Sequence, residues 1–361
     1  MATPSTPSAG RTFTLASRVS QLAQIQTNIV RDALAELQPT TTFETAFMST
    51  GGDHNQSQAL YLLGGKALWT KELEVALRER AVDMLVHSFK DVPTVLPEGC
   101  EIAGVLKRED PLDCLVVKKG EVWKSLEELP DGSVVGTSSV RRVAQLKRRF
   151  PKLVFMDVVS TILWTATVAY ALIDLQNTRM AKLDAPDGPY AALILAKAGM
   201  VRLGWGARVT ADLAPPTLLH AVSQGALAIE IRADDTEARA LCAAVTHWPT
   251  EWACLAERAC LRVLEGGCSV PVGVYTTLME QENGEKGGTL DIIGCVTSLD
   301  GSRHVEHRIQ EEVKSVGEAE DVGMRLAKVL ISTGAKEILD EINVDREKRI
   351  EEAKTKENKA A

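Results

Sequence analysis

The segment Val134-Val135-Gly136-Thr137-Ser138-Ser139-Val140-Arg141-Arg142 combines an apolar strand, a loop of small polar residues and the start of a basic helix. Small side chains let backbone N–H groups approach an anion, and a helix N-terminus adds partial positive charge there. Strand, polar loop and helix in this order are typical of α/β proteins, which bind ligands at the carboxyl ends of their strands. The segment therefore predicts an anion-binding loop in an α/β domain.

The same alternation of strand and helix runs through the preceding part of the chain. Apolar residues predict strands over 12–16 and 42–48 and a buried strand over 82–86. Helical spacing begins after Ser20, the expected N-cap, and returns over 71–77. This alternation predicts an α/β fold with mostly parallel strands.

The later part of the chain changes its pattern. A strand over 191–196, followed by a turn at Ala198-Gly199, continues the α/β style. After that the apolar spacing predicts a helix over 251–264, strands over 272–278, 289–296 and 304–309, and a closing helix over 316–342. Strands followed by a helix are typical of a small α+β domain.

A chain of 361 residues suggests two or three domains. The charged, proline-containing segment 108–113 marks a hinge, and the N-terminus lacks the apolar stretch of a secretory signal. We expect a disordered leader (1–11), a first domain (12–112 and 225–243), a second domain (113–217), a third domain (248–344) and a charged tail (345–361).

The composition excludes several classes of protein. With 41 basic and 49 acidic residues the net charge is −8, which argues against a nucleic-acid-binding protein. The seven cysteines form no C-x-x-C pair, so a disulfide framework and a zinc ribbon are excluded, and a reducing compartment, the cytoplasm, is expected. His304 and His307 lie three apart on a predicted strand and face opposite sides, so no metal site is expected there.

Three groups of residues are candidates for chemistry. Lys90 and Asp91 follow a buried strand, either as a solvated pair or as a carboxylate kept ionised for proton transfer and for stabilising a cation. Cys268 follows two glycines and is either a buried bystander or a thiol attachment point. Cationic residues at predicted loops and helix starts indicate a small polyanionic ligand, unless they are scattered over the surface: Arg18, Lys66, Arg141, Arg142, Arg179 and Arg202.

Taken together, these segments resemble the porphobilinogen deaminase (hydroxymethylbilane synthase) family, from about residue 12 to residue 342. Each motif is weak alone, but their order along the chain is specific. The motifs are Ser17-Arg18-Val19-Ser20-Gln21, Ser49-Thr50-Gly51-Gly52-Asp53, Lys71-Glu72-Leu73-Glu74, His87-Ser88-Phe89-Lys90-Asp91-Val92-Pro93, Arg108-Glu109-Asp110-Pro111, Gly136-Thr137-Ser138-Ser139-Val140-Arg141-Arg142, Gln224-Gly225-Ala226-Leu227 and Glu265-Gly266-Gly267-Cys268.

The resemblance implies two periplasmic-binding-protein-like domains with a cleft between them, plus a small α+β C-terminal domain. It implies a transferase of heme biosynthesis that condenses four porphobilinogens into hydroxymethylbilane and releases ammonia, and a monomer without a nucleic-acid or membrane partner. A dipyrromethane cofactor would be attached to Cys268 by a thioether, with Asp91 and Lys90 as catalytic residues. The implied cofactor-binding residues are Ser88, Lys66, Thr137, Ser138, Arg141 and Arg142, and the substrate-binding residues are Arg18, Ser20, Arg179 and Arg202.

One segment departs from the family pattern. Residues 159–173 hold no charged side chain, and they stand where the family has an Arg-Gly-Asn-type turn, so one substrate-binding arginine is missing. The run is too short for a membrane span, which needs about 20 apolar residues. It is either a natural extra hairpin or helix or, as we prefer, the product of a retained intron or wrong exon junction, which would make this chain a catalytically impaired isoform. Smaller departures are His54 in place of lysine, and Ser223 and Ala228 in place of glycine.

A non-catalytic two-lobed binding protein is the other class that the fold permits. The Gly-Gly-Cys loop at Cys268 distinguishes the two classes, because a simple binder needs no covalent attachment point.

Overall fold

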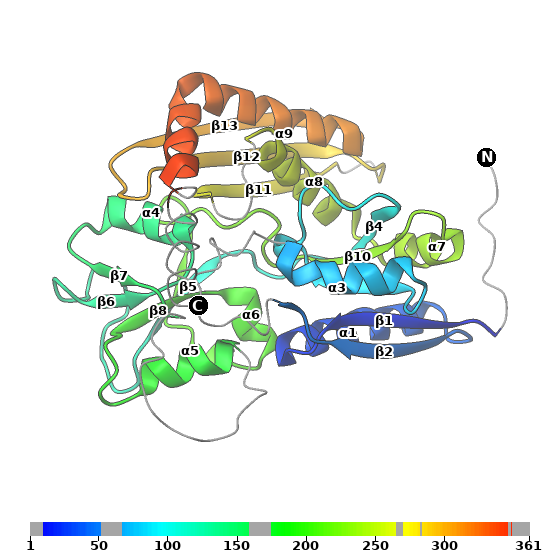
Figure 1. Cartoon of the computed structure of the whole chain (residues 1–361). Coiled ribbons are helices and arrows are strands. Elements are labelled where there is room, and N and C mark those ends of the chain that lie inside the picture. The colour runs from blue at the N-terminus through cyan, green and yellow to red at the C-terminus, as the bar shows by residue number, and fades with distance from the viewer. Residues whose placement is uncertain are drawn as a thin grey trace.

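Three β-sheets organise the chain in the computed structural model, which describes residues 10–51, 67–158, 175–264, 270–281, 284–345 and 348. Two of the sheets have five strands and the third has three. Figure 1 shows the two five-stranded sheets side by side, with the three-stranded sheet and its helices above them. Predicted segments that lie outside the described residues are 159–173, Lys66, His54 and Cys268.

The first sheet has the strand order β2-β1-β3-β10-β4. Its strands are β1 (Thr12–Arg18), β2 (Thr42–Met48), β3 (Met84–Ser88), β4 (Cys100–Val105) and β10 (Leu227–Arg232). The helices of this lobe are α1 (Gln21–Leu37), α3 (Ala67–Arg78) and α7 (Thr236–Val245). Phe13, Val30 and Ile229 belong to the core between the sheet and α1 and α7, because apolar residues at helical spacing face apolar residues of the strands.

The second sheet repeats this arrangement with the order β7-β6-β8-β5-β9. Its strands are β5 (Asp113–Val117), β6 (Val134–Gly136), β7 (Val154–Met156), β8 (Ala192–Ala196) and β9 (Ala211–Leu213). Its helices are α4 (Val140–Arg149), α5 (Leu175–Asp184) and α6 (Lys197–Arg202).

Each five-stranded sheet contains one reversed strand, which enters where the chain crosses between the sheets. β5 follows the crossing from β4 and is antiparallel to β8 and β9. β10 follows the return from β9 and is antiparallel to β3 and β4. The other strands of each sheet run in one direction, so the expectation of mostly parallel strands is confirmed, and β5 and β10 are the exceptions. Two equivalent lobes connected by two crossings form the expected periplasmic-binding-protein-like pair.

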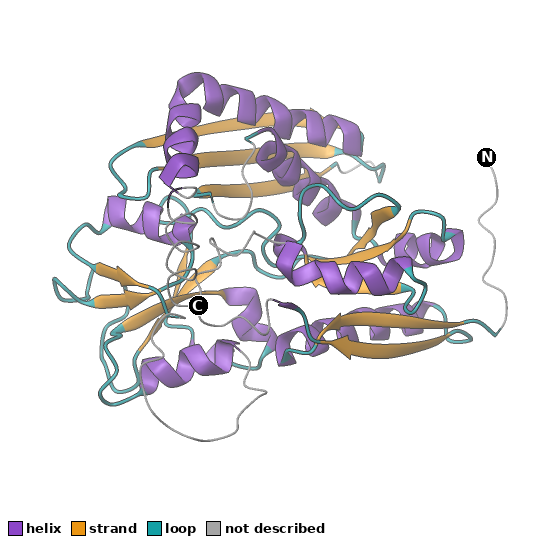
Figure 2. Ribbon diagram, in the orientation of Figure 1, coloured by secondary structure: helices purple, strands orange, loops and turns teal. Residues whose placement is uncertain are grey.

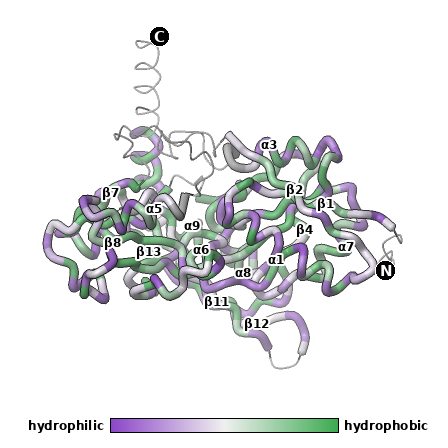
Figure 3. Tube along the Cα trace, turned by 90° about the horizontal axis from the view of Figure 1, so that it is seen from below, coloured by the Kyte–Doolittle hydropathy of each residue, from purple (hydrophilic) through white to green (hydrophobic). Residues whose placement is uncertain are grey.

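The third sheet is an antiparallel meander of β11 (Val272–Glu280), β12 (Gly288–Thr297) and β13 (His304–Val313). Helices α8 (Trp248–Val263) and α9 (Val316–Leu330) contribute to its core, in which Val274, Ile292 and Leu326 are fully buried. Figure 2 shows both helices beside the three strands. In Figure 3 the hairpin of β11 and β12 extends away from the rest of the trace. The expected small α+β domain is therefore confirmed.

Two local predictions are wrong. The expected turn at Ala198-Gly199 is the helix α6, in which both residues are buried beside Met200, because burial of small side chains outweighs the turn tendency of one glycine. The expected continuous helix over 316–342 is interrupted by a π-helical turn at Ile331–Ala335, where Gly334 has a φ of 111°.

The last residue of the predicted leader, 1–11, is held by contacts to the first lobe. This residue, Arg11, forms ion pairs with Asp83, Asp235 and Glu237 at 2.6–2.8 Å.

Among the described residues, no helix has the length and hydropathy needed to cross a membrane.

Candidate active site

The turn that carries Lys90 and Asp91 lies at the carboxyl end of β3. Phe89–Asp91 forms a single 3₁₀ turn, and the Phe89 ring is fully buried. The Phe89 N–H donates to the Ala226 carbonyl at 3.0 Å, and the Ser88 hydroxyl donates to Gln26 Oε1 at 3.0 Å. These two hydrogen bonds, to Ala226 and to Gln26, hold the residues just before Asp91. Asp91 therefore lies at the edge of the sheet where α/β proteins bind ligands.

The predicted anion-binding loop lies at the carboxyl end of β6 in the second lobe. Ser139 is the N-cap of α4, and its hydroxyl accepts from the Arg142 N–H. Ser138 donates to Asp157 Oδ1 at 2.5 Å, and Thr137 is buried. The strand, loop and helix expected for 134–142 are confirmed, and they place Arg141 and Arg142 in the first turn of α4.

Asp113 joins the two arginines of this loop. Its Oδ2 lies 2.8 Å from Arg141 Nη2 and its Oδ1 lies 2.7 Å from Arg142 Nη2, with all three side chains buried. Burial opposes ionisation of Asp113, but the two guanidinium groups outweigh it and hold the pKa of this carboxyl well below its usual range. Two cations against one carboxylate leave one positive charge in excess, which suits an anionic ligand.

Gln224 connects this triad to the first lobe. Its Nε2 donates to Asp113 Oδ1 and to the Pro111 carbonyl, both at 2.8 Å. Its Oε1 accepts from Lys90 Nζ at 3.4 Å. Burial lowers the pKa of Lys90 to about 8, although the carboxylate of Asp91 acts in the opposite direction. Lys90 and the two arginines therefore belong to one network that spans both lobes.

The remaining predicted residues lie at separate positions around this network. Arg202 ends α6 and donates to the Gly225 carbonyl at 2.7 Å, so the structure brings it to the return crossing. Arg18 ends β1, which is parallel to β3, so it lies at the same edge of the sheet as Ser88. Ser20 is the N-cap of α1, and its hydroxyl accepts from the Ala23 N–H. Arg179 lies in α5.

Sequence reasoning missed the residues that hold the two crossings together. Arg108 Nε donates to the Gln224 carbonyl at 2.7 Å, and its other nitrogens pair with Glu257 of α8. Gly225 has a φ of +88°, and a Cβ there would lie 2.4 Å from the Glu109 carbonyl oxygen, so only glycine fits this close approach. Arg108, Gln224 and Gly225 belong to motifs in the sequence, but no spacing rule connects positions so far apart.

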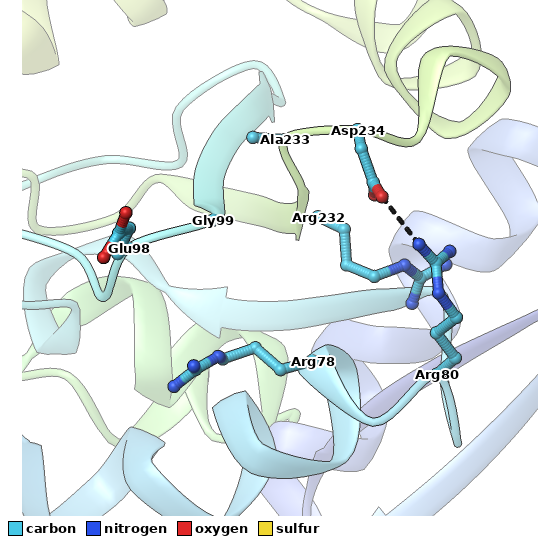
Figure 4. A pocket seen from close by; sticks show the side chains of 7 residues that line it. All are labelled: Arg78, Arg80, Glu98, Gly99, Arg232, Ala233 and Asp234. Atoms are coloured by element: carbon cyan, nitrogen blue, oxygen red, sulfur yellow. Dashed lines mark hydrogen bonds and ion pairs between the residues drawn. The ribbon is translucent and has the colours of Figure 1, made fainter.

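A surface pocket of about 440 Å³ lies away from this network, between the end of α3 and the ends of β4 and β10 (Figure 4). Its lining residues are Arg78, Arg80, Glu98, Gly99, Arg232, Ala233 and Asp234. Arg80 is already paired with Asp234 at 2.6 Å, and Arg232 with Asp235 at 2.7 Å. The pocket contains none of the residues predicted for catalysis, so it is not the candidate active site.

Comparison with known proteins identifies the family of this chain. The family model described as porphobilinogen deaminase, dipyromethane cofactor binding domain, matches residues 13–240, and that of the porphobilinogen deaminase C-terminal domain matches residues 252–332. The porphobilinogen deaminase of Yarrowia lipolytica is 46% identical over 91% of this chain and 92% of its own length. That of Nostoc sp. is 46% identical over 93% of this chain and 96% of its own length.

Proposed function

Because this chain belongs to the porphobilinogen deaminase family, we propose that the network around Asp113 and Gln224 is the site where it condenses porphobilinogen. The reaction is that of hydroxymethylbilane synthase, a transferase of tetrapyrrole and heme biosynthesis. Four porphobilinogens are joined head to tail, one ammonia leaves at each addition, and water releases hydroxymethylbilane. The observation that carries the function is the match of the two family models to residues 13–240 and 252–332.

The dipyrromethane cofactor supplies, when bound, a fixed pyrrole end to which the product chain is joined. The excess positive charge around Asp113 fits a group that carries several carboxylates. We propose that Cys268 holds the group by a thioether, and that polar side chains from both lobes hold its carboxylates. These side chains are Ser88, Lys66, Thr137, Ser138, Arg141 and Arg142.

The acetate and propionate groups of porphobilinogen require cationic partners. We assign this role to Arg18, Arg179 and Arg202, since charge-assisted hydrogen bonds contribute roughly 1.5–3 kcal/mol each. Ser20 also fits this role, because its oxygen accepts from a backbone N–H and its own proton is left to donate to a carboxylate.

Asp91 is assigned the chemical step. Loss of ammonia from porphobilinogen leaves an electron-poor azafulvene, and the condensation that follows develops positive charge. A carboxylate at the end of β3 stabilises that charge and accepts or returns a proton. Lys90, the neighbouring residue, extends the network from this turn to Gln224.

The relatives do not favour the catalytically impaired isoform. The porphobilinogen deaminases of Yarrowia lipolytica and Nostoc sp. each align over more than nine-tenths of this chain at 46% identity, and the family model spans residues 13–240. We further propose a cytoplasmic monomer. The location is supported by the cysteines, because the six in the described part of the chain are all unpaired thiols, as expected in a reducing compartment.

The substitution Asp91→Asn tests the assignment. It removes the negative charge and keeps the shape, so we expect kcat to fall about 10²- to 10⁴-fold while the intact mass still includes the dipyrromethane. Asp187→Asn, at an exposed position, is the matched control and should keep kcat. An Asp91→Asn protein with the kcat of the parent chain would remove Asp91 from the mechanism. A parent chain that consumes no porphobilinogen would overturn the function itself.

A further inference from the structure

We infer that Arg258 is a positioning residue, which fixes the turn carrying Asp91 to the helix that leads toward Cys268. The inference deepens the proposed function and rests on it for its catalytic meaning. Arg258 lies in α8, whereas the turn Phe89–Asp91 follows β3 in the first lobe.

Three contacts of Arg258 converge on the segment that follows Ser88. Its Nη1 donates to the Val92 carbonyl at 3.1 Å, and its Nη2 donates to the Pro93 carbonyl. Its guanidinium carbon lies 4.5 Å from the centre of the Phe89 ring, a distance typical of a cation–π contact. One side chain therefore contacts the turn at Phe89 and also at the two residues that follow Asp91.

The chemistry of these contacts is specific for arginine. Arg258 is 5% exposed, so burial makes hydrogen bonds within the protein necessary for its guanidinium, and two of them go to these carbonyls. A planar guanidinium donates to two carbonyls and stacks on a ring at the same time. A lysine at this position provides the charge but neither the fork nor the flat face.

Arg258 lies in α8 next to Glu257, which also holds segments of the two crossings. The neighbouring Glu257 holds Arg108 and the N–H of Ser223, so adjacent residues of α8 secure the two crossings and the turn with Asp91. Cys268, the proposed attachment point, follows Arg258 by ten positions in the sequence. A helix that fixes the turn thus fixes the position of Asp91 relative to α8, and small errors in the position of a catalytic group reduce the rate strongly.

Hydrogen exchange of the full chain tests the contact independently of activity. The variants are Arg258→Met and Arg258→Lys, with Arg262→Met as the control, because Arg262 lies one turn further along α8 and is exposed in its pair with Glu320. For Arg258→Met we expect faster exchange at the Phe89 and Val92 amides and unchanged exchange in β11–β13. Arg258→Lys should be intermediate and Arg262→Met unchanged. Exchange that is unchanged at 89–92, or faster throughout all three sheets, would overturn the inference.

Steady-state kinetics supplies the second measurement. For cofactor-loaded Arg258→Met we expect kcat to fall roughly 10- to 100-fold and KM for porphobilinogen to stay within about threefold. Partial recovery in Arg258→Lys is expected, since an ammonium restores the positive charge and donates to a carbonyl. A kcat within about twofold of the parent overturns the inference. If the parent itself shows no turnover, the proposed function fails, and the exchange measurement still decides whether Arg258 holds the turn.

A variant on the other side of the contact covers the case in which the Arg258 variants do not fold. Phe89→Leu keeps an apolar side chain in the core but removes the aromatic face. We expect faster exchange at the Val92 amide and a kcat lowered by roughly two- to fivefold. Parent-like exchange and kcat in Phe89→Leu would then overturn the inference.

Discussion

Arg108 and Glu257 form a buried two-point ion pair, with Nη1–Oε1 at 2.7 Å and Nη2–Oε2 at 3.1 Å, although they are 149 positions apart in the sequence. Arg108 also donates to the Gln224 carbonyl, and Glu257 accepts from the Ser223 N–H at 2.6 Å. Arg108 lies in the outward crossing from β4 to β5, Ser223 and Gln224 belong to the return crossing from β9 to β10, and Glu257 lies in α8. A single pair thus ties both crossings to the third domain.

Replacing Glu257 by glutamine should destabilise the protein strongly. The Arg108 guanidinium would stay buried without a counter-charge, a change that typically costs about 3–5 kcal/mol. Denaturant unfolding measures this loss of free energy. The matched control is Glu320→Gln, which breaks an exposed pair with Arg262 and should cost no more than about 1 kcal/mol. Equal losses in the two variants would contradict the structural role of the pair.

Asp113→Asn should damage both stability and substrate binding. The asparagine keeps the shape of the side chain but leaves Arg141 and Arg142 without their shared carboxylate, so we expect a loss of about 3–5 kcal/mol. KM for porphobilinogen should rise, because the two guanidinium groups lose the partner that orients them. Asp131→Asn, which breaks an exposed pair with Lys152, should change neither quantity. An Asp113→Asn protein with parent-like stability and KM would exclude this role.

Ser223→Gly should stabilise the protein. Ser223 has a φ of 60°, in the left-handed region that costs a residue with a Cβ roughly 1–2 kcal/mol. Glycine removes this cost but gains freedom in the unfolded chain, so the expected net gain is about 1 kcal/mol. Ser223→Ala keeps the Cβ in the same conformation and should bring no such gain. Stabilisation by alanine equal to that by glycine would show that the backbone is not the cause.

His220 should make stability depend on pH between about 6.5 and 4. Burial, assisted by the charge of Arg108, lowers the pKa of this imidazole from 6.5 to about 4, although Glu257 acts in the opposite direction. The unfolded chain therefore binds a proton at a pH where the folded chain does not, and stability present above pH 6.5 is lost as the pH falls to about 4. The loss from one such group is on the order of 3 kcal/mol.

The substitution His220→Gln checks this prediction by chemical unfolding at pH 7 and at about pH 4.5. The difference in free energy of unfolding between the two pH values should be smaller in this variant than in the parent chain. The control His307→Gln, on the exposed surface of β13, should keep the parent's difference. A His220→Gln variant with the full difference would assign the acid sensitivity to other groups.

Local features of the fold could be predicted from the sequence, but contacts between residues far apart in the sequence could not. The helix cap at Ser20 and the loop over 137–139 depend on side chains that hydrogen-bond to backbone groups only a few residues away. The partnership of Asp113 with Arg141, or of Arg258 with Val92, depends on chain crossings that bring separate elements together. Such contacts leave no periodic pattern in a single sequence.

The motifs predict which residues belong to the candidate site, but not how those residues contact one another. The motifs predict Lys90, Arg141 and Arg142 as site residues, but they give no reason for Gln224 to lie between Lys90 and the two arginines. That reason is visible only in the folded chain, where Gln224 donates to Asp113 and accepts from Lys90.

The most direct test of the central claim is the intact mass of the purified chain, measured before and after porphobilinogen is added. If the chain builds its product on a dipyrromethane at Cys268, its mass should exceed the sequence mass by one dipyrromethane and rise in further steps with substrate. Cys268→Ser should show the bare sequence mass in both conditions. A parent chain at the bare mass, unchanged by porphobilinogen, would contradict the account and point to the apolar segment 159–173 as the lesion.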